Sequence, residues 1–248
     1  MSFVNLSRHN TTFLAGHDFA AGPERALLGA LRDVAQYGMG QVDNAFHEQQ
    51  LWARYAVPIN YEDREKDVMV KLDRDVLDLT DAVGSFTAHP SVVTTSGFVR
   101  IRNGEEGWHT DGTFDRDSGS TLHGSGLRLL MKLGGVESHV VAAAQNDHMV
   151  KLFPNSEDVY PKECAHFVSA RYLSGSLILM PQSLEKPLKT TTTDAGLTAV
   201  ESPYHTGMQD PGDGFRTLLL VDIATNGTHL ALDIPAHTVR APSTALYH

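Results

Sequence analysis

The sequence predicts a mainly β domain covered by N-terminal helices, and two observations predict it. From about residue 92 onward, short β-branched and apolar runs alternate with Gly, Asn, Asp and Pro, as strands alternate with turns. Before that point, apolar residues recur at helical spacing. Many short strands at fairly even spacing are typical of an all-β sandwich or barrel and not of βαβ units.

The first helix is expected to begin near Pro23, a residue suited to the first helical position. One face of it carries Leu27, Leu28, Leu31, Val34 and Ala35. Gly38 and Gly40 are expected to interrupt this helix, which could resume over residues 46–52. A second, shorter helix is indicated by an i, i+3, i+4, i+7 pattern at Val76, Leu79, Thr80 and Val83.

The expected strands cover residues 92–101, 126–133, 139–143, 148–153, 165–172, 176–180, 215–223 and 229–232. Residues 189–194, with four successive threonines, are read as a further strand or a polar loop. No repeat or linker divides the chain. We therefore predict one domain over residues 1–248, with a helical N-terminal layer (1–90), a β core (91–235) and a C-terminal tail (236–248).

Composition excludes several classes of protein. A net charge of -10 over 248 residues, with no dense run of Lys or Arg, disfavours nucleic acid as a partner. No apolar stretch is long enough for a signal peptide core or a membrane span, so no membrane partner and a cytoplasmic location are expected. The single cysteine, Cys164, rules out an intramolecular disulfide and is expected to be buried or half-buried.

A His-x-Asp pair at His109 and Asp111 is the most informative feature. Residues two apart in a strand point to the same face, so an imidazole and a carboxylate can meet at one point. A distant second histidine would complete a facial triad that leaves three positions of an octahedral iron(II) open. Two of those positions suit a bidentate 2-oxo acid and one suits oxygen.

His205 is the best candidate for that histidine, because a Gly- and Asp-rich turn follows it and then an apolar strand that opens with Arg216. A hairpin would bring Arg216 back near His205, where its planar guanidinium could bind a carboxylate. The competing histidines are His123, His139, His148, His166, His229 and His237. A structural pair at His109 and Asp111 and a surface position for Arg216 are the plain alternatives.

The string Trp108-His109-Thr110-Asp111, followed by Thr113 and Phe114, resembles the metal-binding motif of the iron(II)/2-oxoglutarate dioxygenases, and locally their taurine-dioxygenase branch. The resemblance covers about residues 97–225. It implies a double-stranded β-helix core, also called a jelly roll and similar to the cupins. It also implies that His109, Asp111 and His205 bind iron(II) and that Arg216 binds the C5 carboxylate of 2-oxoglutarate.

The implied reaction is oxidation of a small molecule by 2-oxoglutarate and oxygen, with release of succinate and carbon dioxide. An amino acid or natural-product intermediate is the expected kind of substrate. Because Asp111 is present, hydroxylation or a related oxidation is favoured over halogenation. Thr113 could contact the cofactor, and Trp108 is expected to pack. Anionic substrate groups could be held by Arg100, Arg102, Arg128 and Lys132, for which a solvated strand face is the alternative.

The sequence departs from the taurine-dioxygenase pattern at two points. The interval between Asp111 and His205 is shorter than usual, and Thr217 and Leu218 replace an Arg-x-Ser motif after Arg216. The second partner of the C5 carboxylate is therefore unassigned. Two other classes compete: a cupin-type metal-dependent dioxygenase or isomerase, which the absence of any His-x-His disfavours, and a non-enzymatic jelly-roll binding module.

Overall fold

The computed structural model describes part of the chain, and every structural statement below concerns that part. The described residues are 2–4, 9–10, 21–45, 68–72, 92–102, 107–110, 114–115, 120–121, 126–144, 149–151, 159–173, 175–182, 191–192, 198–200, 202–209, 216–225 and 230–232.

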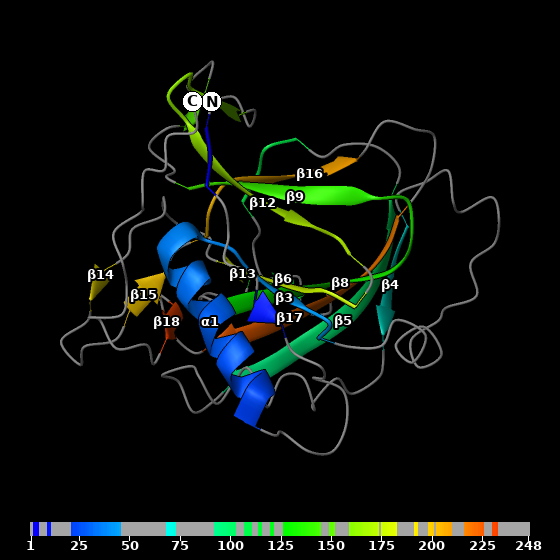
Figure 1. The fold of residues 1–248 in the computed structure, drawn as a ribbon. Coiled ribbons are helices and arrows are strands. Elements are labelled where there is room, and N and C mark those ends of the chain that lie inside the picture. The colour runs from blue at the N-terminus through cyan, green and yellow to red at the C-terminus, as the bar shows by residue number, and fades with distance from the viewer. Residues whose placement is uncertain are drawn as a thin grey trace.

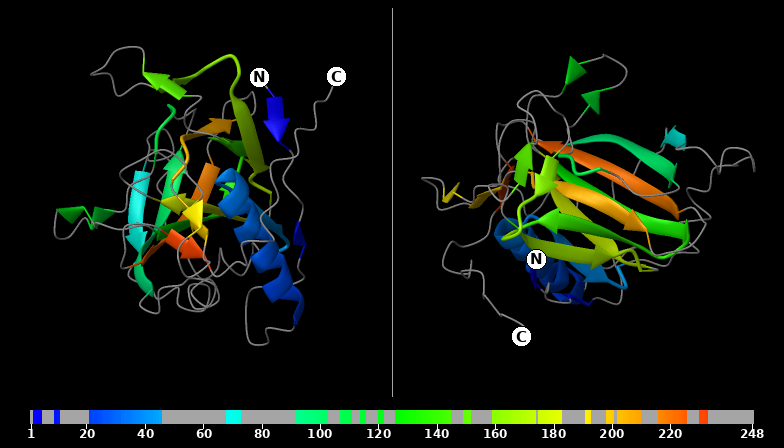
Figure 2. Two further views of the ribbon diagram at one scale, coloured as in Figure 1. Left: turned by 90° about the vertical axis from the view of Figure 1, so that its left-hand side faces the viewer. Right: turned by 90° about the horizontal axis from the view of Figure 1, so that it is seen from above.

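Two sheets face each other and form the core of the molecule (Figures 1 and 2). The seven-stranded sheet has the order β2-β3-β13-β8-β17-β5-β4 and the four-stranded sheet the order β1-β12-β9-β16. The strands of the larger sheet are β2 (His9–Asn10), β3 (Gly40–Asp43), β13 (Leu177–Gln182), β8 (Gly126–Gly135), β17 (Arg216–Thr225), β5 (Val92–Arg102) and β4 (Val68–Leu72). Those of the smaller sheet are β1 (Ser2–Val4), β12 (His166–Arg171), β9 (Ser138–Ala143) and β16 (His205–Gln209).

Chain order and spatial order together define a jelly roll. In chain order the core segments are β5, the segment at His109, β8, β9, β12, β13, β16 and β17, and His109 pairs with β16 through an isolated antiparallel bridge. If these segments are numbered one to eight in chain order, segments six, three, eight and one are neighbours in the larger sheet. Segments five, four, seven and two are neighbours in the smaller sheet. A chain that passes from sheet to sheet in this way is an eight-stranded jelly roll, so the predicted core is confirmed.

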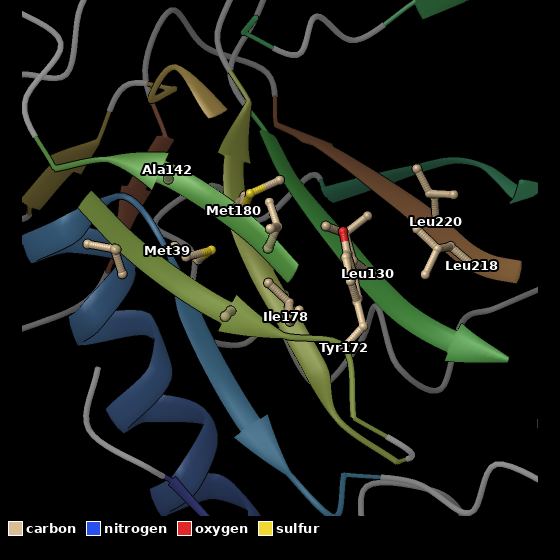
Figure 3. Packing of buried hydrophobic residues seen from close by; sticks show 11 residues of the cluster. Met39, Leu130, Ala142, Tyr172, Ile178, Met180, Leu218 and Leu220 are labelled. Atoms are coloured by element: carbon tan, nitrogen blue, oxygen red, sulfur yellow. The ribbon is translucent and has the colours of Figure 1, made fainter. Parts of the chain in front are cut away.

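The space between the sheets is filled by a cluster of buried apolar side chains from both inner faces (Figure 3). Alternation along each strand decides which residues belong to it. In β13, Ile178 and Met180 face the cluster, whereas Leu177 and Leu179, equally buried, lie on the opposite face of the sheet. Each such fully buried side chain contributes about 1.5–3 kcal/mol of transfer free energy.

Helix α1 (Ala21–Tyr37) packs against β3 and β13 and covers the outer face of the larger sheet (Figure 1). Its apolar side chains Leu27, Leu31 and Val34 are fully buried, as their spacing predicted. The helix ends at Tyr37, and the next residue is Gly38, whose φ of 77° suits glycine and whose N–H donates to the carbonyl of Val34 over 2.9 Å.

Most predicted elements are found close to their expected bounds. The remaining strands are short: β6 (Phe114–Asp115), β7 (Ser120–Thr121), β10 (Met149–Lys151), β11 (Val159–Pro161), β14 (Thr191–Thr192), β15 (Thr198–Val200) and β18 (Leu230–Leu232). The second helix expected around residues 76–83, the resumed helix at 46–52 and the tail at 236–248 lie outside the described residues.

Three expectations need correction or addition. The layer over residues 1–90 also supplies strands β1 to β4, which the sequence analysis did not predict. Cys164 is exposed and not buried, because it lies in the turn between β11 and β12. The strands that begin at His205 and Arg216 form no hairpin within one sheet, since β16 and β17 belong to different sheets. No described helix is long and apolar enough to cross a membrane.

Candidate metal centre

His109 and His205 lie directly opposite each other at the edge of the smaller sheet. The N–H of His109 donates to the carbonyl of His205 over 3.0 Å, and the N–H of His205 donates back to the carbonyl of His109 over 2.8 Å. Residues that exchange both backbone hydrogen bonds present their side chains on the same face. The imidazole centroids are accordingly 4.5 Å apart, with their planes at 51°.

That shared face is the inner face of the jelly roll. His205 is the register partner of Ala142 in β9, and Ala142 and Val140 belong to the cluster between the sheets. His205 is only 4% exposed. The two imidazoles therefore lie on the inner faces of the jelly roll, at the first residue of β16.

Both imidazoles are oriented by backbone carbonyls two residues earlier in the chain. Nδ1 of His109 lies 2.7 Å from the oxygen of Gly107, and Nδ1 of His205 lies 3.2 Å from the oxygen of Pro203. A carbonyl oxygen can only accept a hydrogen bond, so each Nδ1 carries the proton and donates it. The lone pair is then on Nε2, which is the arrangement of metal-binding histidines with an outer hydrogen-bond partner.

Packing on the outer face holds the His109 segment in place. Trp108, one residue before His109, stacks on Phe167 with ring centroids 5.4 Å apart and also packs against Ala143, Met149 and Val159. Alternation along an extended segment sends Trp108 outward and His109 inward. The predicted packing role of Trp108 is confirmed, and the indole fixes the position of the imidazole beside it.

The orientation of His205 depends on helix α1 through one glycine. A Cβ on Gly38 would approach Cγ of Pro203 to 2.9 Å, and the carbonyl of Pro203 is the one that orients His205. Sequence reasoning missed Gly107 and Pro203, because they contribute only backbone oxygens. A histidine preceded by an extended residue at i−2 is too common a pattern to indicate such a bond.

We expect Gly38→Ala to lower the free energy of unfolding by about 1–2 kcal/mol, since alanine is strained at positive φ. By displacing Pro203 it should also weaken metal binding roughly tenfold, the effect typical of outer partners of a ligating histidine. Thermal unfolding and metal titration measure the two effects. Gly134→Ala is the matched control, because its Cβ would meet nothing within 4 Å; equal metal affinity in both variants would refute the role of Gly38.

Arg216 is the largest buried polar residue at the opposite end of the inner faces. It is 2% exposed and occupies the first position of β17, on the same face as Leu218 and Leu220 of the inner cluster. Its register partners are Gly135 and Arg102. Arg216 makes further interactions, while its Nε atom is buried with no hydrogen-bond partner among the described residues. A surface position for Arg216 is thereby excluded.

Other predicted site residues are described only in part. Asp111 and Thr113 lie outside the described residues. Arg100 and Arg102 occupy register positions opposite Leu218 and Arg216. Arg128 is partly buried on β8, opposite Met180 and Asp222.

Of the competing histidines, His139 and His166 are described, on β9 and β12, and neither joins the His109–His205 pair. Within the described ranges no group of three His, Cys, Asp or Glu side chains could hold a metal. A metal bound to this pair would need a third ligand from outside those ranges. His123, His148, His229 and His237 also lie outside them.

Comparison with known proteins gives only distant similarities. No protein-family model matches the chain, and no curated protein sequence matches it. Among solved structures, it is similar to the epimerase SnoN in complex with Fe3+, alpha ketoglutarate and nogalamycin RO. That similarity has a TM-score of 0.47 and 11% identity, covering 81% of this chain and 84% of SnoN.

A second similarity is to HygX from Streptomyces hygroscopicus with iron bound, with a TM-score of 0.43, 11% identity and coverage of 79% and 86%. A third is to a Pseudomonas putida prolyl-4-hydroxylase, with a TM-score of 0.42, 10% identity and coverage of 81% and 100%. At this distance the similarities assign no function, which has to be inferred from the residues of this chain.

Proposed function

We propose that this chain is a mononuclear non-haem iron(II) oxygenase that uses 2-oxoglutarate and oxygen to oxidise a small molecule. The observation that carries the proposal is the convergence of His109 and His205 on the inner face of a jelly roll. Both imidazoles are held with the lone pair on Nε2. Imidazole nitrogens with one carboxylate are a donor set suited to iron(II), so the residues fit this metal.

His109, Asp111 and His205 would hold the iron, and Arg216 would bind the C5 carboxylate of 2-oxoglutarate. The iron, when bound, supplies the activation of oxygen that drives decarboxylation of the 2-oxo acid and oxidation of the substrate. The protein orients the metal-binding side chains and shields them from water. The carbonyls of Gly107 and Pro203 hold the imidazoles, and the apolar side chains of Leu218, Leu220 and Leu130 exclude water from the region between the sheets.

A small metabolite is the proposed substrate, since the net charge of -10 repels nucleic acid. Because the chain is small, an amino acid or a natural-product intermediate is the proposed kind of substrate. The proposal includes hydroxylation as the outcome, because Asp111 keeps the carboxylate ligand that halogenases lack.

The first test is binding of 2-oxoglutarate to the iron(II)-loaded protein without oxygen. Binding is measured by the visible charge-transfer absorption of the complex. Succinate formation in air is the second readout. We expect both to require iron and to be lost in Asp111→Ala. Iron-dependent oxidation without 2-oxoglutarate would indicate the cupin-type alternative. Failure to bind iron and 2-oxoglutarate would indicate a binding module.

Arg216→Met should weaken 2-oxoglutarate binding about a hundredfold while leaving iron affinity unchanged, since charged hydrogen bonds to a carboxylate each contribute about 1.5–3 kcal/mol. Titration of the iron(II)-loaded protein measures this effect. Arg171→Met, which removes an exposed arginine paired with Glu137, is the control. If the two variants bound 2-oxoglutarate equally well, Arg216 would have no part in the site.

A further inference from the structure

Each histidine of the pair is preceded by an aromatic residue that lies on the outer face of the smaller sheet. Trp108 precedes His109, and Tyr204 precedes His205. Because the two imidazoles lie on the inner face, alternation along the chain sends the indole and the phenol outward. Both aromatic side chains pack against one cluster of buried residues there, made of Ala143, Met149 and Val159. The two halves of the histidine pair therefore share one support.

Two members of that cluster come from the two-stranded antiparallel sheet of β10 and β11, here called the β10–β11 ribbon. Met149 lies opposite Pro161, and Lys151 lies opposite Val159. These positions share one face of the ribbon, and on it Met149 and Val159 are only 8% and 5% exposed. The other face carries Tyr160, which is 44% exposed. One face of the ribbon thus covers the two aromatic residues, and the other meets solvent.

The two aromatic residues touch the smaller sheet itself at different places. Trp108 stacks on Phe167 of β12 and packs against the cluster that Phe167 forms with Val141 and Ala165. Tyr204 is joined to β9 through its backbone, because its carbonyl accepts the N–H of Ala143 over 2.7 Å. The ribbon packs against both aromatic residues, so it can fix their positions relative to each other.

The backbone connection between the two histidines is short. His109 and His205 form an isolated bridge, joined by two hydrogen bonds of 3.0 and 2.8 Å. Side chains of a functional site have to be held within about 0.5 Å of their productive positions, which requires packing around them. One bridge does not by itself prevent the His109 segment from rotating. The packing of Trp108 and Tyr204 therefore decides where the imidazoles lie.

We propose that the β10–β11 ribbon, through Met149 and Val159, holds Trp108 and Tyr204 in place and so sets the geometry of the histidine pair from the outer face of the sheet. Met149 and Val159 are positioning residues, since they act through the aromatic residues and do not touch the metal. This inference rests on the metal centre of the proposed function. Coupling of this kind is reciprocal, so a metal bound to both histidines also stabilises the packing of the ribbon.

The test is calorimetric titration of the wild-type protein and its variants with nickel(II), well below the temperature at which any of them unfolds. Met149→Ala should weaken nickel(II) binding roughly tenfold, the effect typical of groups that orient a ligating histidine. Met149→Leu, which nearly conserves the volume of the side chain, should restore most of the affinity. Every variant is folded under these conditions, so a loss of stability alone would leave the affinity unchanged.

Met131→Ala is the matched control, because it removes the same atoms from β8. Met131 is 1% exposed and lies opposite Leu177 and Leu219, on the face of the larger sheet that points away from the inner cluster. Its loss should lower the unfolding temperature at least as much as Met149→Ala does, yet leave nickel(II) affinity as in wild type. Equal weakening in the two variants, or wild-type affinity in Met149→Ala, would overturn the inference.

Hydrogen exchange gives a second readout that does not depend on the folding of a ribbon variant. Nickel(II) should slow exchange of the ribbon amides in the wild-type protein. The slowing should exceed that in β4, an edge strand of the larger sheet, and should be absent in His205→Ala. Equal slowing in the ribbon and β4 would count against the coupling. If the wild-type protein bound no nickel(II), the metal centre of the proposed function would itself fail, which separates the two outcomes.

Discussion

Replacing His205 with alanine should weaken iron(II) binding by at least about a hundredfold and abolish 2-oxoglutarate turnover. Even outer partners of metal-bound histidines contribute roughly ten- to a hundredfold, so loss of a ligand should exceed that range. The fold should survive, because the hydrogen bonds between His205 and His109 are made by backbone atoms that alanine retains. Iron titration without oxygen, succinate formation and thermal unfolding measure the three expectations.

The same substitution elsewhere on the smaller sheet supplies the control. His139 lies on β9 opposite Met208, on the face away from His205, and is partly buried. His139→Ala removes an imidazole from a neighbouring strand, so a general loss of packing would affect both variants alike. We expect His139→Ala to bind iron as wild type does. Wild-type iron affinity in His205→Ala would refute the metal centre.

The sequence predicted the strands well, because their signal is local. The strands expected at residues 92–101, 126–133 and 215–223 are found as β5, β8 and β17, with bounds that differ by at most two residues. Their β-branched and apolar runs are interrupted by turn residues at each end. Strands such as β1 and β2 were not predicted, since two or three residues carry no periodicity and depend on partners far along the chain.

Spatial arrangement was harder to predict than the elements themselves. A hairpin between the strands at His205 and Arg216 was the simplest expectation, but the chain crosses from one sheet to the other between them. The meeting of His109 with His205 was expected from the turn and the Arg216 strand that follow His205, and from the resemblance, and not from periodicity. Lys132 was named as a possible partner of an anionic group, but only the register of β8 and β17 relates it to Arg216.

Gly40→Ala should destabilise the protein by about 3 kcal/mol, near the upper end for overpacking of a closely packed site. A Cβ at this position would overlap the carbonyl oxygen of Ala30 and lie 2.8 Å from its carbonyl carbon. Both atoms belong to the backbone of helix α1, so no side-chain rotation can relieve the contact. The helix and β3 would have to separate, exposing apolar surface that both now bury. Thermal and urea unfolding followed by circular dichroism measure the loss.

Gly134→Ala is the matched control within the same sheet. Its Cβ would meet nothing within 4 Å, and its backbone is not among the described glycines with positive φ. Alanine there should be neutral or stabilise by about 0.4–1 kcal/mol, by restricting the unfolded chain. Equal stability of the two variants would show that α1 does not lie against β3 as described.

Because α1 also positions Gly38 against Pro203, a loosened helix should lower metal affinity together with stability. That coupling would show that the helical layer supports the metal centre as well as covering the sheet.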